Sequence, residues 1–340
     1  MPRTSAWPSP VPDALSGPPL GPTPLRLLIV TDAWAPQVNG VVRTLSTMAA
    51  MLRAAGDTVE VIGPDRFRSI PMPGYAEIRL ALAPRRRLET LVDAYMPCAV
   101  HIATEGPLGW AMRGICRRRG WPFTTAFHTK FAEYMRARAG IPTAWSWRLL
   151  RHFHGPAQAT MAATPSLRAE LTARGFRRLR PWTRGVDLAR FRPENRATEA
   201  FPGLPRPIFL YAGRVAVEKN IAAFLALDLP GSKVVVCDGP QRAALEARFP
   251  EAHFLGFRDN GALARSYAGA DVFVFPSRTD TFGLVLLEAM ASGTPVAAFP
   301  VTGPLDVVTD PRVGVLDQDL RAACLAALAC DRAAARAHAE

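Results

Sequence analysis

The sequence predicts an α/β fold with two doubly wound domains, each built on a parallel sheet. Short runs rich in β-branched and aromatic residues alternate with helical patterns in both halves of the chain. Between residues 181 and 207 the chain turns polar and proline-rich, which is typical of an interdomain linker. With 340 residues and 49% hydrophobic content, the chain is long enough and apolar enough for two cores of ordinary size.

The first half opens with a strand, a helix and a second strand. We expect strands over residues 25–31 and 58–62, joined by an amphipathic helix that follows Gly40 and stops at Gly56. Residues 1–24 are crowded with proline and glycine, and we interpret them as a flexible leader, not a signal peptide. Three further strands are predicted in this half, over residues 99–103, 123–127 and 160–163.

The second half repeats the alternation after the linker. Its predicted strands cover residues 208–212, 233–237, 253–255, 271–275 and 296–299. Ligands of such sheets bind at the carboxyl ends of the strands, so residues that follow a strand are the candidates for chemistry. The predicted organisation is a leader over 1–24, a first domain over 25–185, a linker over 186–206 and a second domain over 207–340.

Composition excludes several classes of protein. No run of 18 apolar residues occurs, so no membrane span is expected. The five cysteines form no C-x-x-C pair, which favours free thiols in a reducing compartment over a disulfide framework or a zinc site. No G-x-G-x-x-G follows the first predicted strand and no Walker A motif is present.

Positive charge is concentrated in the first half. Residues 1–200 carry 28 Lys and Arg against 14 Asp and Glu, whereas the rest of the chain is slightly acidic. Arginine clusters at 85–87 and 117–119 favour an anionic lipid surface or a polyanionic acceptor. The alternative is a compositional bias toward arginine that decorates solvated helix faces. No nucleic-acid-binding signature accompanies the charge, so no nucleic acid partner is expected.

Two carboxylates lie eight positions apart after the strand at 271–275. Asp280 falls in the predicted loop, and Glu288 falls in a helix that stops at Gly293. Glu288 is placed to accept hydrogen bonds from ribose hydroxyls and Asp280 to hold hydroxyls of a transferred sugar. The alternative is an N-cap aspartate and a solvated helix glutamate. This helix is expected to start with the backbone N–H groups of Phe282, Gly283 and Leu284. Such N–H groups favour an anion, for example a diphosphate.

Two cations follow the strand at 208–212. Arg214 and Lys219 are spaced to reach one site, where a guanidinium and an ammonium stabilise a departing phosphate without a metal. The alternative is a pair of surface charges. Lysine occurs at only three positions in the chain, which makes its use here informative.

Three other strand or helix ends are candidates. Asn39 and Gly40 stand at a helix start, where glycine permits close approach of a phosphate or sugar. Gly239 follows the strand at 233–237 and suits close approach by a base or phosphate, with a plain turn as the equal alternative. His128 closes the strand at 123–127; a lone histidine in such a place is more often structural.

Four segments together resemble the retaining, family-4 glycosyltransferases of GT-B fold. Residues 277–290 resemble their acid-x7-acid motif, residues 211–220 their G-R-x4-K motif, residues 34–42 their N-terminal loop and residues 184–187 their linker entry. In that family the first acid is commonly glutamate, and Asp280 is one methylene shorter. Relatives usually continue into a helix that crosses back onto the first domain, whereas this chain ends at Glu340, so we expect the second domain to be truncated, less stable or completed by a partner.

The resemblance implies two Rossmann-like domains that face a cleft, and a metal-independent hexosyltransferase without a cofactor. The donor is expected to be GDP-mannose or a UDP-hexose, the acceptor a lipid or a cell-surface glycan, and the location cytoplasmic, peripheral at the inner membrane face. A sugar-nucleotide 2-epimerase of the same fold and an inactive nucleotide-sugar or polyanion-binding module are the alternatives. The implied catalytic residues are His128, Arg214, Lys219 and Asp280, and the donor-binding residues are Asn39, Gly40, Gly239, Phe282, Gly283, Leu284 and Glu288.

Overall fold

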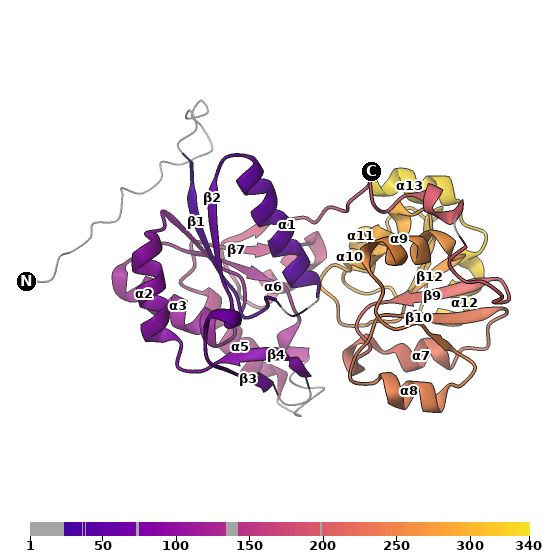
Figure 1. The fold of residues 1–340 in the computed structure, drawn as a ribbon, viewed down its shortest axis with the longest axis horizontal. Helices are drawn as coiled ribbons and strands as arrows, with labels where there is room; N and C mark the ends of the chain where they lie inside the picture. Colours follow the sequence, from indigo (N-terminus) through magenta and orange to yellow (C-terminus); the bar gives the residue numbers. More distant parts are fainter. Residues whose placement is uncertain (1–23, 36, 38, 73–74, 134–141, 198) are drawn as a thin grey trace, which may run out of the picture. The chain divides into compact units, whose positions relative to one another are not determined.

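The computed structural model describes residues 24–340 except 36, 38, 73–74, 134–141 and 198. The predicted leader therefore lies outside the described residues apart from Pro24. The chain divides into two compact units, each with its own sheet (Figure 1). The first comprises Met1–His128, Ala144–Ala162 and Thr172–Arg180, and the second Thr129–Thr143, Ala163–Leu171 and Pro181–Glu340, within the described residues.

The sheet of the first unit has the strand order β2-β1-β5-β6-β7-β8. The five strands predicted here are confirmed: β1 (Arg26–Val30), β2 (Thr58–Ile62), β5 (Ala99–Ile102), β6 (Thr124–Phe127) and β7 (Ala159–Ala162). They pair in parallel from β2 to β7. Three strands were not predicted: β8 (Leu179–Pro181) at the sheet edge, and an antiparallel pair, β3 (Ser69–Met72) and β4 (Tyr75–Ala81).

Helices follow most of these strands. The predicted first helix is α1 (Gly40–Ala54), and Gly56 just beyond it has a φ of 98°, a left-handed conformation that glycine adopts without strain. The helices α2 (Arg85–Tyr95) and α3 (Pro107–Arg119) pack with strand residues such as Leu28 and Val30 in one core. Also described before the second sheet are α5 (Thr143–His154), a 3₁₀ turn, η1, at Pro64–Arg66, and α6 (Pro165–Ala173), most of which falls in the second unit.

The sheet of the second unit has the order β11-β10-β9-β12-β13-β14, and all its pairs are parallel. The five predicted strands are confirmed within a residue or so, and β14 is additional. Their bounds are β9 (Ile208–Ala212), β10 (Ser232–Val236), β11 (His253–Phe254), β12 (Val272–Phe275), β13 (Val296–Ala298) and β14 (Gly314–Leu316).

Helices cover both faces of this second sheet (Figure 1). Alternate residues of β9 point to opposite faces, so Ile208 and Leu210 join one core while Phe209 and Tyr211 join the other. One face is covered by α9 (Asn260–Gly269), α10 (Leu284–Ala291) and α13 (Arg332–Ala339), and the other by α7 (Ile221–Leu225), α8 (Arg242–Arg248) and α12 (Leu320–Ala327). Shorter turns are η2 (Pro193–Ala197), η3 (Val217–Lys219) and α11 (Pro304–Val307).

The segment predicted as a linker packs on the second unit. Phe191 and Phe201 are buried in the core beneath α9 and α10. Composition marked this stretch as polar and proline-rich, but its two aromatic side chains bury enough apolar surface to anchor it. In the part of the chain that the structure describes, every helix is too short or too polar to span a bilayer.

Candidate active site

The junction between β12 and α10 is built around Gly283. This residue has φ 85° and ψ 66°, and a Cβ there would lie 2.9 Å from Cδ1 of Leu286, so only glycine fits without strain. Gly283 occupies the N-cap position and supplies no side-chain cap. Asp280 is therefore not the N-cap residue of α10. The first N–H groups of a helix have no acceptor within the helix, and the helix dipole favours an anion beside them.

Lys219 and Asp280 meet at this edge of the sheet. Nζ of Lys219 lies 2.5 Å from Oδ2 of Asp280, and the two side chains are 23% and 17% exposed. Lys219 ends η3, which follows β9, and Asp280 follows β12. Because β9 and β12 are neighbours in a parallel sheet, their carboxyl ends lie together. The structure thus brings one predicted cation and one predicted acid into direct contact.

Arg214 belongs to the loop that leads from β9 toward Lys219. Its carbonyl oxygen accepts a 2.9 Å hydrogen bond from the hydroxyl of Tyr211, which is buried. Burial raises the pKa of the Tyr211 hydroxyl, an effect that the charge of Lys219 opposes. The hydroxyl therefore stays protonated and holds the loop that carries Arg214.

Glu288 is buried inside the second unit. Its side chain belongs to a residue only 3% exposed, and Oε2 accepts a 2.9 Å hydrogen bond from the hydroxyl of Tyr267 in α9. The alternative of a solvated helix glutamate is therefore excluded. Burying a carboxylate is costly unless it is hydrogen-bonded, so this position is built to hold an acid.

The backbone at Gly239 approaches another part of the same chain. A Cβ at Gly239 would lie 2.3 Å from the carbonyl oxygen of Val215, in the loop after β9. That loop is also tied to the turn by a 2.9 Å bond from the Val215 N–H to the Asp238 carbonyl. The close packing of Val215 explains why glycine is needed here, and a contact with base or phosphate stays a prediction.

In the first unit, Asn39 caps α1. Its Oδ1 accepts hydrogen bonds from the N–H groups of Val41 and Val42, each at 3.0 Å, and Gly40 is the first residue of the helix. His128 directly follows β6 and is half-buried. The neighbouring Pro36 and Val38 of the N-terminal loop lie outside the described residues.

At the carboxyl edge of the first sheet lies a buried polar network that the sequence analysis did not predict. Oδ1 of Asp32 accepts from the Leu108 N–H at 2.8 Å, and Oδ2 from the Thr104 hydroxyl at 2.9 Å. Burial raises the pKa of Asp32 to about 6, although these hydrogen bonds lower it. Nearby, Nε2 of His154 lies 3.1 Å from Oε1 of Glu105.

The sequence offered one indication of this network, which is that its acids come soon after predicted strands. Asp32 and Glu105 are the first charged residues after β1 and β5, and Asp280 is the first acid after β12. For His154 the sequence showed only a second histidine two positions earlier. Within the described parts of the chain, no three His, Cys, Asp or Glu side chains are grouped to hold a metal ion.

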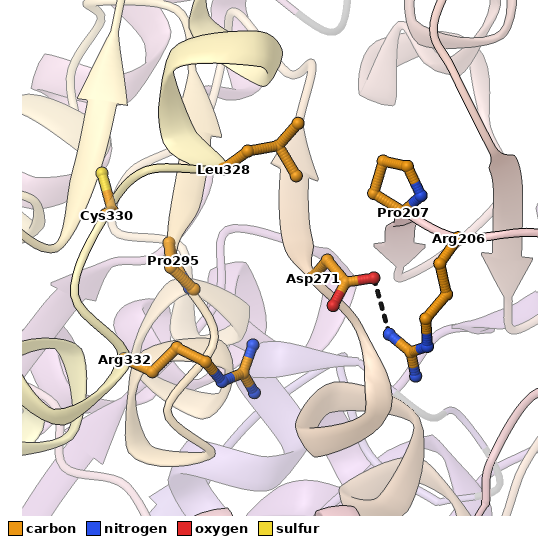
Figure 2. A pocket seen from close by; sticks show the side chains of 7 residues that line it. All are labelled: Arg206, Pro207, Asp271, Pro295, Leu328, Cys330 and Arg332. Carbon is orange, nitrogen blue, oxygen red and sulfur yellow. Dashed lines mark hydrogen bonds and ion pairs between the residues drawn. The ribbon is translucent and has the colours of Figure 1, made fainter.

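A pocket of about 450 Å³ opens at the other end of the second sheet (Figure 2). Four of its seven lining residues precede strands: Arg206 and Pro207 come before β9, Asp271 before β12 and Pro295 before β13. Arg206 pairs with Asp271 at 2.6 Å. Because these are the amino ends of parallel strands, the pocket is separate from the edge that carries Lys219 and Asp280.

Two parallel-sheet domains, with cations and carboxylates at the strand exits of the second, define a glycosyltransferase of GT-B type. The comparisons with known proteins agree. Residues 38–190 match the family model described as Glycosyltransferase Family 4, and residues 206–331 match Glycosyl transferases group 1. The chain belongs to glycosyltransferase family 4 and is a retaining hexosyltransferase.

Individual relatives cover most of the chain. It is 33% identical to a GDP-mannose-dependent alpha-mannosyltransferase of Mycobacterium tuberculosis, over 86% of this chain and 83% of that protein. It is 30% identical to the sulfoquinovosyl transferase SQD2 of Arabidopsis thaliana, over 82% of this chain and 60% of that one. Among solved structures, sucrose-phosphate synthase of Thermosynechococcus elongatus has a TM-score of 0.71 at 24% identity, covering 92% of both chains.

These findings confirm the predicted fold class and the transferase activity. They give no support to the 2-epimerase or to an inactive binding module. The roles of the individual site residues remain predictions.

Proposed function

We propose that the protein transfers mannose from GDP-mannose to a lipid or glycan acceptor. The observation that carries the proposal is 33% identity to GDP-mannose-dependent alpha-mannosyltransferases of two mycobacterial species, over 86% of this chain. A GDP-mannose-dependent alpha-mannosyltransferase of Corynebacterium glutamicum is 28% identical over the same share of this chain. A UDP-hexose is the second candidate donor, since the similarly folded Anabaena protein HepE was solved with UDP and glucose, at 16% identity and a TM-score of 0.65.

In this proposal the second unit holds the donor. Arg214, Lys219 and the N–H groups that open α10 bind the diphosphate, and Glu288 binds the ribose. Asp280 contacts the hexose. The bond between the anomeric carbon and the diphosphate oxygen breaks, and the acceptor oxygen attacks on the same face. The acceptor proton passes to a phosphate oxygen of the leaving group, so no nucleophilic carboxylate is needed.

Lys219 supports this assignment through its contact with Asp280. The carboxylate keeps the ammonium at the strand exit and balances its charge before donor binds. A diphosphate at the mouth of α10 adds negative charge there, and a positioned ammonium stabilises that charge most as the bond breaks.

The donor is tested by comparing GDP-mannose, UDP-glucose and UDP-galactose in thermal shift and in turnover. A donor at 100 times its Kd should stabilise the fold by about 2.7 kcal/mol. GDP-mannose is expected to give the largest shift and to release GDP only when acceptor is present. Release of UDP from UDP-glucose with no reaction of GDP-mannose would replace the mannosyl proposal with the second candidate.

The acceptor side is proposed to include an anionic lipid surface. The two arginine clusters lie on α2 and α3, which ion pairs join: Arg118 with Glu89 at 2.6 Å and Arg119 with Asp93 at 2.5 Å. Two acids facing two clusters of three arginines leave a net positive surface. Co-sedimentation with phosphatidylglycerol vesicles, lost in 0.5 M salt and absent with phosphatidylcholine, is the expected result. Equal binding to neutral vesicles would contradict it.

A further inference from the structure

Two side chains from different helices form a polar contact inside the apolar core of the second unit. Tyr267 of α9 is 0% exposed, Glu288 of α10 is 3% exposed, and the tyrosine hydroxyl donates to Oε2 at 2.9 Å. The two residues are 21 positions apart in the sequence. A hydroxyl that donates to a buried carboxylate makes one of the stronger hydrogen bonds in a protein.

The surroundings fix the tyrosine ring. Phe191 packs edge-on against it with ring centroids 5.7 Å apart, and Phe273 of β12 lies at 5.5 Å. The Tyr267 carbonyl accepts a 2.6 Å hydrogen bond from the hydroxyl of Thr294, just before β13. With the ring and backbone both held, the hydroxyl has one position from which it reaches Glu288.

Packing alone does not account for a tyrosine here. A phenylalanine would fill the same space, and the hydroxyl adds only a polar atom that must be satisfied. Its partner is the one acid of α10, at the second position of the acid-x7-acid motif. The contact therefore acts on the orientation of that carboxylate.

We propose that Tyr267 is a positioning residue for donor recognition: its hydroxyl holds the carboxylate of Glu288 in the plane that accepts hydrogen bonds from the ribose. The inference rests on the proposed role of Glu288 and adds to it a residue that never touches the donor. Ribose recognition is then set by a helix-to-helix contact in the core. A loosely held Glu288 would distinguish ribose from deoxyribose less sharply.

The test is Tyr267→Phe, with Kd measured by calorimetry for GDP and 2′-deoxy-GDP. In the wild type GDP should bind more tightly, and the variant should lose about tenfold in GDP affinity with little loss for the deoxy compound. The ratio of the Kd for 2′-deoxy-GDP to the Kd for GDP therefore falls toward one in the variant. KM for the nucleotide sugar should rise similarly while kcat changes little.

A merely structural tyrosine would lower Tm and leave the preference for ribose unchanged, and that result would overturn the inference. Because both nucleotides are compared on one preparation, partial unfolding cannot alter the ratio of their Kd values. Tyr95→Phe is the matched control: the Tyr95 hydroxyl donates to the carbonyls of Leu27 and Thr58 in the first unit, so its loss should affect stability only.

Glu288→Ala separates the inference from the proposal beneath it. Loss of the ribose preference in Glu288→Ala but not in Tyr267→Phe would contradict the positioning role alone. An unchanged preference in Glu288→Ala would remove the ribose role of Glu288, and the inference with it.

Discussion

The two sheets use helix N-termini in opposite ways. In the first unit, α3 begins beside β1, and Asp32 accepts from the N–H groups of Leu108 and Gly109 at 2.8 and 3.3 Å. In the second unit, the N-cap residue of α10 is Gly283, which has no side chain that could accept these hydrogen bonds. In both units a helix follows a parallel strand. The N-terminal N–H groups of that helix donate to a carboxylate of the protein in the first unit, and they have no side-chain cap in the second. The proposed binding of the donor diphosphate is therefore placed at the second.

Electrostatics at the two edges differ accordingly. The first edge gathers Asp32 and Glu105 with hydroxyls and His154, so it is an acid-rich, buried network. The second edge carries Arg214 and Lys219, with Asp280 as a counter-ion. The residues that follow the strands thus make one edge rich in acids and give the other two cations.

The largest expected effect comes from removing the ammonium of the second edge. Lys219→Ala should lower kcat about a thousandfold, since a positioned charge at the departing phosphate contributes about 4 kcal/mol. Steady-state release of nucleoside diphosphate measures it. Lys233→Ala is the matched control, because Lys233 donates to the carbonyls of Leu225 and Leu227 and should affect stability only. Equal turnover in Lys219→Ala and the wild type would remove Lys219 from the site.

Asp32→Asn should change how stability depends on pH. The folded pKa of Asp32 is about 6, above the ordinary 3.8, so the folded state favours the protonated acid. Its contribution is fully present below pH 3.8 and is lost as pH rises through 6. Relative to the variant, the wild type should lose about 3 kcal/mol of unfolding free energy across that window. Urea unfolding at several pH values measures the difference.

Asp310 supplies a control of opposite sign. Arg312 lowers the pKa of Asp310 to about 2, so its contribution is present above pH 3.8 and is lost as pH falls through 2. The stability difference between Asp310→Asn and the wild type should therefore be present above pH 3.8 and disappear as pH falls through 2. A flat difference between Asp32→Asn and the wild type would show that burial does not govern Asp32.

Gly283→Asp would place a carboxylate at the N-terminus of α10, where α3 already has Asp32. A carboxylate at the helix mouth competes with the diphosphate for the same N–H groups, and donor affinity should fall about 30-fold, or about 2 kcal/mol. Gly283→Ala controls for the strained backbone, because its Cβ meets Leu286 without adding charge. If both variants weaken the donor equally, strain and not charge explains the effect.

The smallest effect is expected at Asn39. Asn39→Ala should cost about 1 kcal/mol of stability, because the N–H groups of Val41 and Val42 lose their acceptor. Asn39→Asp keeps the cap and removes the amide donor. Normal donor KM in the stable Asn39→Asp variant would assign Asn39 to helix capping, whereas a raised KM would support the predicted donor contact.

Residue pattern was enough to predict most of the architecture. Ten strands were predicted from apolar, β-branched runs, and α1 and α10 from their helical spacing and their glycine stops at Gly56 and Gly293. These features depend on residues adjacent in sequence, where conformational preferences act directly. The short β8 and β14 and the β3–β4 pair lacked a comparable run. The segment predicted as a linker packs on the second unit because Phe191 and Phe201 are buried there, and composition does not reveal that burial.

The pairing of side chains was decided by the tertiary structure. Motif spacing pointed to Lys219 and Asp280 separately, but only the adjacency of β9 and β12 joins them. Asp32 reaches the N-terminus of α3 from 76 positions away, and Tyr267 reaches Glu288 from another helix. Such contacts depend on strand order and helix packing, which no local window of residues encodes. The residue types that follow the strands therefore predicted the class of reaction, and tertiary packing determined which side chains contact each other.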